Sequence, residues 1–412
     1  MRGLELSPVL IALVSFAAVA CGGNDNTPPP SDAGGHDTGP LDGGPGLDAG
    51  PADDAGTLLD AGNPDSPAAD GGSAVCDAHA AGALVLERDV PTWSDRPYDL
   101  RLPSAYDCHV PVPVLLVFHG GGSNKNDMQL LSCPGTNPRV RPTDSEAPGC
   151  LNAIAETERI AVVYANGTRN PTAMGEVRTF NAGGGRDGYE CVSGYACDNT
   201  SDDVAYVDDL LDDLETVVLV DRGRVFAAGI SNGAAMSHRL ACELPGRITA
   251  IAPISGGNQL AAVDTCVPPR AIPVLEIHGD ADRAWPYLGG PGTGLVCTLT
   301  MCEDMVGIPD RSDLVRGPST IGGWLARNGC DVTPVTSTLP DVDPGDGSTV
   351  TVDTWGACAE GVNVVLYSVA GGGHTWPGGF QYLAVATIGR TNRDINASQV
   401  MIDFFRAQTG DW

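Results

Sequence analysis

Short runs of apolar residues, separated by turn-forming residues, recur along the chain from residue 84 onward. Runs of this length predict buried strands. They lie at 84–89, 98–102, 112–118, 160–164, 224–228, 248–254, 274–277 and 364–369. The first two, joined by a short turn that contains proline, indicate an antiparallel pair ahead of the main sheet.

Helical spacing of apolar positions appears between the later runs. It is clearest over 203–214, where acidic residues alternate with the apolar stripe Val204, Val207, Leu210, Leu211 and Leu214. We expect further helices after residue 231, at 319–328 and at 398–408. Strands that alternate with helices predict an α/β fold with a mostly parallel central sheet flanked by helices on both faces.

The N-terminus has the pattern of an export signal. Residues 8–20 are apolar but too few to span a bilayer, and Ala18-Val19-Ala20-Cys21 fits either ordinary signal-peptidase cleavage or a lipobox. The chain has 13 cysteines, so lipidation of Cys21 leaves 12, an even number suited to disulfides. We therefore interpret 1–21 as a lipoprotein signal peptide that ends in a lipidated cysteine.

Residues 22–75 differ in composition from the rest of the chain. They contain ten aspartates, no lysine or arginine, and almost no large apolar residue. Such a segment cannot bury enough surface to offset its ordering entropy, so it predicts a disordered linker. One folded domain is then expected over 76–412.

The net charge of −29 limits the partners of the protein. Nucleic acid requires a basic surface, which the sequence lacks, and polyanionic substrates would be repelled. Neutral polymers and small esters remain possible substrates.

The sequence Gly229-Ile230-Ser231-Asn232-Gly233 lies between a predicted strand and a predicted helix. A G-x-S-x-G in that context is typical of a nucleophile elbow, in which the glycines permit a tight turn that exposes the serine hydroxyl. Ser231 is therefore the candidate nucleophile.

A nucleophilic serine needs a base and an acid, which follow it in the order Ser, acid, His in this kind of fold. Of the seven histidines, His374 alone follows the candidate acids, in a glycine-rich loop after the strand at 364–369. The acid is Asp280 or Asp282, and spacing does not choose between them; the other aspartate would bind turn amides.

An oxyanion hole is predicted from His119-Gly120-Gly121-Gly122, directly after the strand at 112–118. Backbone amides aimed at the substrate oxygen stabilise the charge that develops there. We expect one amide from Gly121 or Gly122 and a second from Asn232, whereas His119 is expected to be structural.

Four segments carry a resemblance to a known family: VFHGGGSN, RVFAAGISNGAAMSHRLACELPGRITAIAPISG, EIHGDADRAWPY and VAGGGHTWPGG. They are similar to the polyhydroxybutyrate depolymerase and feruloyl/acetylxylan esterase family, related to carbohydrate esterase family one. The resemblance implies an α/β-hydrolase fold and serine esterase chemistry without cofactor or metal. It implies Ser231 as nucleophile, His374 as base and Asp282 as acid, with Tyr287 and Trp376 at the substrate.

Pairing of the remaining cysteines is not determined by their order. We expect six disulfides: Cys76–Cys108, Cys133–Cys150, Cys191–Cys197, Cys242–Cys266, Cys297–Cys302 and Cys330–Cys358. Asp198, Asp202 and Asp203 lack the spacing of a calcium loop, so we interpret them as a solvated turn and helix N-terminus.

The expected function is that of an exported serine esterase, tethered to the membrane only through its lipid anchor and active on feruloyl or acetyl esters of plant polysaccharide. Poly(3-hydroxybutyrate) is the alternative substrate, and a non-catalytic binding module on a hydrolase scaffold is the alternative of another class. The expected location is the cell surface or outer membrane, or the medium after release. The sequence does not determine the oligomeric state.

Overall fold

The computed structural model describes residue 76 and residues 85–171, 173, 175–183, 195–198, 201–259, 266–289, 292–293 and 320–412. The predicted signal peptide, Cys21 and the linker over 22–75 lie outside these residues. Within the described part of the chain, no helix is both long and apolar enough to cross a membrane.

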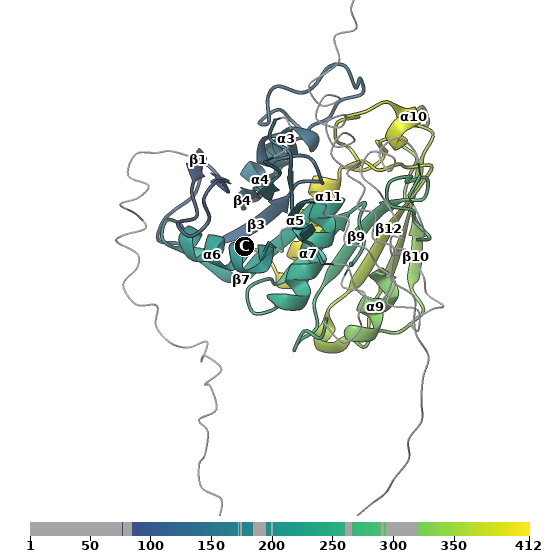
Figure 1. Cartoon of the computed structure of the whole chain (residues 1–412). Coiled ribbons are helices and arrows are strands. Elements are labelled where there is room, and N and C mark those ends of the chain that lie inside the picture. Colours follow the sequence, from purple (N-terminus) through teal and green to yellow (C-terminus); the bar gives the residue numbers. More distant parts are fainter. Residues whose placement is uncertain are drawn as a thin grey trace, which may run out of the picture. The chain divides into compact units, whose positions relative to one another are not determined.

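A ten-stranded sheet in the order β1-β2-β4-β3-β7-β8-β9-β12-β11-β10 forms the centre of the fold (Figure 1). The strands β3, β4, β7, β8, β9 and β12 pair in parallel, and antiparallel strands extend the sheet at both ends. The ten strands are β1 Val85–Arg88, β2 Tyr98–Arg101, β3 Val112–Phe118, β4 Ala161–Ala165, β7 Val220–Ile230, β8 Ala250–Ile254, β9 Val274–Gly279, β10 Val335–Thr338, β11 Thr349–Trp355 and β12 Val364–Ala370. A separate two-stranded hairpin pairs β5 Thr168–Arg169 with β6 Arg178–Thr179.

Helices cover both faces of the sheet and enclose two hydrophobic cores. One core takes side chains from α6 Asp203–Glu215, α7 Asn232–Glu243 and α9 Thr320–Arg327. The other takes them from α3 Lys125–Leu131, α4 Leu151–Glu158 and α11 Ala397–Thr409. The short helices are α5 Tyr195–Asp198, α10 Val385–Ile388 and the 3-10 turn η1 Ala359–Gly361.

The strand β3 shows why this sheet must be covered twice. All of its residues are buried, with Leu116 and Phe118 in one core and Leu115 and Val117 in the other. Alternate side chains of a strand point to opposite faces, so a strand that is apolar throughout is stable only between two layers. The predicted α/β-hydrolase architecture, a mostly parallel sheet flanked by helices, is confirmed.

The predicted strands are all present, and the first two form the expected antiparallel pair. The helix predicted over 203–214 begins after Asp202, whose side chain accepts a hydrogen bond from the amide of Ala205 and caps the helix. The structure adds β10 and β11, the β5–β6 hairpin, and the short helices α3 and α4, which the sequence analysis did not predict.

Cysteine pairing agrees with four of the expected disulfides: Cys76–Cys108, Cys133–Cys150, Cys242–Cys266 and Cys330–Cys358. Cys191, Cys297 and Cys302 lie outside the described residues, so the two other expected pairs are not described. Disulfides of this number are typical of proteins that fold in an oxidising compartment.

Parallel pairing brings the carboxyl ends of the central strands to one edge of the sheet. Phe118 of β3 pairs with Gly229 of β7, and Ile230 pairs with Ile254 of β8. Farther along the sheet, Gly279 of β9 pairs with Val369 of β12. The segments that follow β3, β7, β9 and β12 therefore meet at this edge, which is where open α/β sheets bind their ligands.

Candidate active site

Ser231 occupies the turn between β7 and α7. Its backbone has φ 57° and ψ −121°, a conformation that residues with a side chain rarely adopt. The turn is held in place because the Ser231 amide donates to the carbonyl of Ile254 at 3.0 Å, and the Ser231 carbonyl accepts from Ala235 at 3.0 Å. This strained strand-to-helix turn has the geometry of a nucleophile elbow.

The two glycines of the motif let the backbones of the elbow approach β3. A Cβ atom at Gly233 would lie 2.1 Å from the carbonyl oxygen of Phe118, and one at Gly229 would lie 2.6 Å from the same atom. No side chain fits at either position without moving β3 or α7. The requirement for glycine is therefore steric on both sides of Ser231.

His374 and Asp282 are hydrogen-bonded to each other. His374 Nδ1 lies 2.8 Å from Asp282 Oδ2, and the other carboxylate oxygen accepts from the amides of Ala284 and Trp285, each at 2.8 Å. Burial raises the pKa of Asp282, but the charge of His374 and the hydrogen bonds from His374 and His278 outweigh it and lower this pKa to about 2. Asp282 is therefore ionised at neutral pH and holds the imidazole with Nδ1 as the donor.

Asp280 has a different role from its neighbour. Its side chain is exposed, and Oδ1 accepts a hydrogen bond from the amide of Gly371 at 2.7 Å. It thus stabilises the start of the loop that carries His374. Of the two acids that spacing left open, Asp282 contacts His374 and Asp280 binds a turn amide.

The loop that carries His374 is anchored on several sides. The His374 amide donates to the carbonyl of Ile388 at 2.6 Å, and the Tyr382 hydroxyl donates to the His374 carbonyl at 2.9 Å. The Ser255 hydroxyl, at the end of β8, donates to the carbonyl of Thr375 at 3.2 Å. No hydrogen bond joins the Ser231 hydroxyl to His374 in the described part of the chain. In enzymes without substrate such bonds are often long, and they tighten in the complex.

The glycine loop after β3 lies against the elbow. A Cβ atom at Gly120 would be 3.6 Å from the Cβ of Ser231, and one at Gly121 would be 3.6 Å from the Cβ of Asn232. The amide of Gly122 donates to the carbonyl of Arg178 at 2.9 Å. Because that hydrogen bond occupies the Gly122 amide, the geometry favours Gly121 of the two candidate oxyanion donors.

Asn232 braces the same region through its side chain. Its Oδ1 accepts from the Phe180 amide at 2.8 Å, and its Nδ2 donates to the Phe180 carbonyl at 2.9 Å. The side chain thus pairs with the backbone after β6 as a neighbouring strand would. The sequence indicated Asn232 only for its backbone amide, and no motif predicted this function of its side chain.

His119 fits the structural role expected for it. Its Nδ1 lies 2.8 Å from the Gly120 carbonyl, and its Nε2 lies 3.0 Å from the amide of Gly167, which donates to it. One ring nitrogen must donate and the other must accept, so the ring is neutral. Burial, the largest effect, lowers the pKa of His119 to about 3, which agrees with this assignment.

The substrate contact predicted for Trp376 is wrong in this conformation. Trp376 is fully buried in the core beneath α11, and its indole N–H donates to Ser398 at 3.1 Å. A side chain without accessible surface cannot touch a ligand, so Trp376 anchors the loop. Tyr287 is partly exposed, its hydroxyl is hydrogen-bonded to Ser368 and its ring lies edge-on to His278; its contact with substrate stays a prediction.

Asp203 is also not solvated, contrary to the interpretation of the acidic segment. It is fully buried and forms an ion pair with Arg96. The guanidinium group of Arg96 in turn lies 3.6 Å from the ring centroid of Tyr206. Asp202 does cap the helix, as expected of an acid at a helix N-terminus.

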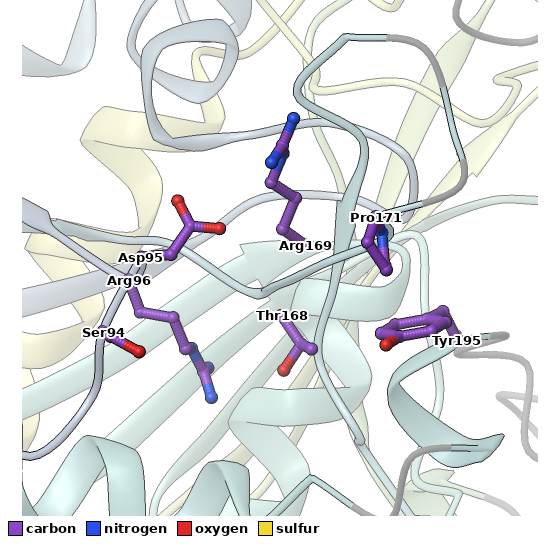
Figure 2. Close-up of a pocket in the computed structure, with 7 residues that line it drawn as sticks. All are labelled: Ser94, Asp95, Arg96, Thr168, Arg169, Pro171 and Tyr195. Atoms are coloured by element: carbon purple, nitrogen blue, oxygen red, sulfur yellow. The ribbon is translucent and has the colours of Figure 1, made fainter.

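A pocket of about 250 Å³ lies beside the β5–β6 hairpin. Figure 2 shows the residues that line it. It is lined by Ser94, Asp95, Arg96, Thr168, Arg169, Pro171 and Tyr195. None of these residues is a candidate for catalysis, and the ion pair with Asp203 already engages Arg96. We therefore assign the chemistry to the strand ends near Ser231.

The chain has curated relatives that are named as esterases. NocK of Nocardia uniformis subsp. tsuyamanensis, named as an esterase, is 28% identical over 294 residues, which cover 71% of this chain and 73% of the relative. Feruloyl esterase B of Piromyces equi is 28% identical over 43% of this chain and 30% of its own length. A protein of Aspergillus oryzae named as a feruloyl esterase C is 24% identical over 70% of this chain and 80% of its own length.

No family model matches the chain. Among solved structures, an acetyl xylan esterase from Aspergillus awamori aligns with 78% of this chain and 99% of its own, at 11% identity and a TM-score of 0.43. The fold assignment therefore rests on the sheet topology and the elbow of this chain. The chain spans less than one third of the Piromyces esterase, 30% of its length.

The sheet, the strained serine elbow and the coupled His–Asp pair, together with the esterase relatives, define a serine carboxylic ester hydrolase with an α/β-hydrolase fold. Within that class the chain resembles the feruloyl esterases, as its motifs indicated. The fold, the class of reaction and the family resemblance predicted from the sequence are thus confirmed.

Proposed function

We propose that this protein hydrolyses feruloyl or acetyl esters on plant polysaccharide, with Ser231, His374 and Asp282 as its catalytic triad. One observation carries the triad: His374 and Asp282 are hydrogen-bonded at 2.8 Å, at the sheet edge where Ser231 occupies a strained elbow. The substrate class is supported by the relatives that are named as feruloyl esterases.

In this mechanism, Ser231 Oγ attacks the ester carbonyl while His374 Nε2 takes the hydroxyl proton. His374 Nδ1 is engaged with Asp282, so Nε2 is the nitrogen that can accept it. The negative charge on the substrate oxygen is stabilised by the backbone amides of Gly121 and Asn232. His374 then gives this proton to the leaving oxygen of the sugar as the ester C–O bond breaks, and an acyl group remains on Ser231.

Water completes the reaction by the same route. His374 removes a proton from water, the resulting hydroxide attacks the acyl-enzyme, and the intermediate releases ferulate or acetate. His374 returns the proton to Ser231 Oγ. The cycle consumes one ester and one water and needs no other reactant.

Export and tethering complete the proposal. The described disulfides favour an oxidising compartment. A lipid on Cys21 and the linker over 22–75 would place the enzyme at the cell surface, in reach of polymer outside the cell. Mass spectrometry of the mature N-terminus would detect the lipid.

Replacement of the nucleophile tests the triad. In the full-length protein, Ser231→Ala should lower kcat on a chromogenic acetate ester by about a thousandfold or more, because the group that forms the acyl-enzyme is absent. Labelling by a fluorophosphonate should also disappear. Ser337→Ala, on the exposed edge strand β10, is the matched control and should retain full activity. Retention of more than about one hundredth of the rate by Ser231→Ala would contradict the assignment.

The substrate is tested by product release. Feruloylated and acetylated xylan should yield ferulate or acetate, whereas poly(3-hydroxybutyrate) should yield no 3-hydroxybutyrate. Release of 3-hydroxybutyrate from the polyester, with no product from either xylan, would show that the polyester is the substrate instead. An absence of turnover on every ester, with no fluorophosphonate labelling, would favour a non-catalytic binding module.

A further inference from the structure

A chain of buried polar side chains extends away from the acid of the triad. His278, on β9, has Nε2 3.4 Å from Asp282 Oδ2, the oxygen that also accepts from His374. On its other side, His278 Nδ1 lies 3.4 Å from Glu276 Oε1. The second oxygen of Glu276 lies 3.3 Å from Nε2 of His238, on α7. The side chains of His238, Glu276 and His278 have no accessible surface.

The hydrogen-bond partners of His278 favour its doubly protonated form. Nε2 lies 2.8 Å from the carbonyl oxygen of Trp285, which can only accept, so Nε2 carries a proton. Nδ1 faces the carboxylate of Glu276 and is placed to donate to it. Burial lowers the pKa of His278, but hydrogen bonds to Asp282 and Glu276 outweigh burial and raise it to about 10.

The far end of the chain orients Glu276. The indole N–H of Trp324, on α9, donates to His238 Nδ1 at 3.0 Å. An indole nitrogen is only a donor, so His238 Nδ1 accepts and its Nε2 carries the proton that faces Glu276. A buried carboxylate is stable only with such partners. Glu276 therefore receives one donor from each histidine.

We propose that His278 is a positioning residue of the triad, a buried imidazolium that shares the Asp282 carboxylate with His374 and is held charged by Glu276. This inference rests on the proposed triad and goes beyond it. The cation helps to fix the orientation of Asp282 through the same carboxylate oxygen that His374 contacts. It also offsets part of the negative charge of Asp282 that His374 faces.

The titratable groups around His278 come from several elements. Glu276 and Asp282 belong to β9 and the turn after it, and His238 approaches from α7. Tyr287 lies with its ring centroid 6.0 Å from that of His278, and His374 and Tyr382 face Asp282 from the loop after β12. Of these, the carboxylates lie nearest and decide the charge of the ring.

Glu276→Gln is the sharpest test because it removes the charge and keeps the shape. A glutamine can accept from His238 through Oε1 and donate to a neutral His278 through Nε2, so both hydrogen bonds survive. With His278 neutral, the imidazolium of His374 is no longer repelled. The acidic limb of the kcat/KM profile should move to higher pH by on the order of one pH unit, with the plateau changed only a few-fold.

His278→Gln, which removes the cation directly, should move the same limb in the same direction. Glu243→Gln, at the exposed end of α7, removes one charge outside this network and is the matched control, with no shift expected. The full-length protein also gives a readout apart from activity. The ¹⁵N spectrum of the imidazole groups should show one ring protonated on both nitrogens at pH 8 in the wild type and not in Glu276→Gln.

Two results would overturn the inference: a Glu276→Gln profile that superimposes on that of the wild type, or a wild-type His278 that is neutral at pH 7. If either result is found and Ser231→Ala is nevertheless inactive, the proposed esterase function stands and the proposed role of His278 is wrong. If Ser231→Ala remains active, the triad itself is wrong, and the role of His278 falls with it.

Discussion

Asp280 and Asp282 show how position decides the function of chemically identical side chains. The first is exposed and caps the amide of Gly371; the second is buried, accepts from two amides and holds His374. A buried carboxylate whose remaining lone pairs are occupied holds one imidazole tautomer without competition from solvent. At the scale of the residue, the difference between the two lies entirely in their partners.

A pair of isosteric variants tests this difference. Asp282→Asn should lower kcat on a chromogenic ester by about a thousandfold or more, because an amide can present its N–H to His374 and select the wrong tautomer. Asp280→Asn keeps an oxygen for the Gly371 amide and should stay within a few-fold of the wild type. Circular dichroism should show that both fold. A greater loss in Asp280→Asn would assign the acid to that residue instead.

At the scale of the element, the site depends on how closely α7 and β7 approach β3. Gly229 and Gly233 let the turn close, and the carbonyl of Phe118 fills the space that their side chains would take. The conformation of Ser231 costs on the order of 1–3 kcal/mol, which the surrounding packing has to offset. The elbow is therefore tightly coupled to the strand that leads to the oxyanion loop.

Gly233→Ala should separate these elements. Its methyl group would overlap the Phe118 carbonyl, so we expect a loss of roughly 2 kcal/mol or more in the free energy of unfolding, together with reduced activity. Gly246→Ala is the control, since a Cβ there has no heavy atom within 4 Å. Urea denaturation measures both variants. Equal denaturation midpoints for Gly233→Ala and the wild type would show that the Phe118 carbonyl does not exclude a side chain at position 233.

At the scale of the whole molecule, buried histidines limit stability on both sides of neutral pH. His119 is neutral in the fold with a pKa of about 3, so its stabilisation is lost as the pH falls from about 6.5 toward 3. The pKa of His278 is about 10, so its stabilisation is full below about 6.5 and is lost as the pH rises toward 10. Stability from these two groups is therefore greatest near pH 6.5.

His119→Gln should remove the part of the stability loss at acid pH that comes from His119. Glutamine supplies a donor and an acceptor but does not titrate, so the difference in unfolding free energy between wild type and variant should change between pH 6.5 and 4 by up to about 1.4 kcal/mol per pH unit. Comparison at each pH cancels the effect of the overall negative charge. Parallel stability curves for the two proteins would show that His119 does not titrate in this range.

Much of the site was predictable because the order of the catalytic residues along the chain, and their position at the ends of strands, leave few candidates. The elbow, the glycine loop and His374 all follow apolar runs, and parallel pairing then brings them together. Trp376 was assigned wrongly because a motif gives a residue type but not its burial. The short helices α3 and α4 were missed because eight residues or fewer carry little periodicity.

The buried network was missed although one signal for it is present in the sequence. Glu276 interrupts the apolar run of β9, and a carboxylate in a strand buried on both faces must have partners. Those partners are His278, two residues farther along β9, and His238 on α7, whose separation from Glu276 in the sequence no local pattern records. A charged residue inside an otherwise apolar parallel strand is thus a reason to search for a distant histidine.

The Asn232 side chain ties the elbow to the backbone that follows β6. Its paired hydrogen bonds end at Phe180, so the residue that supplies an oxyanion amide is also held by that segment. A chimaera that exchanges a segment next to Phe180 must therefore keep the Phe180 backbone in place if it is to retain the machinery that cleaves the ester.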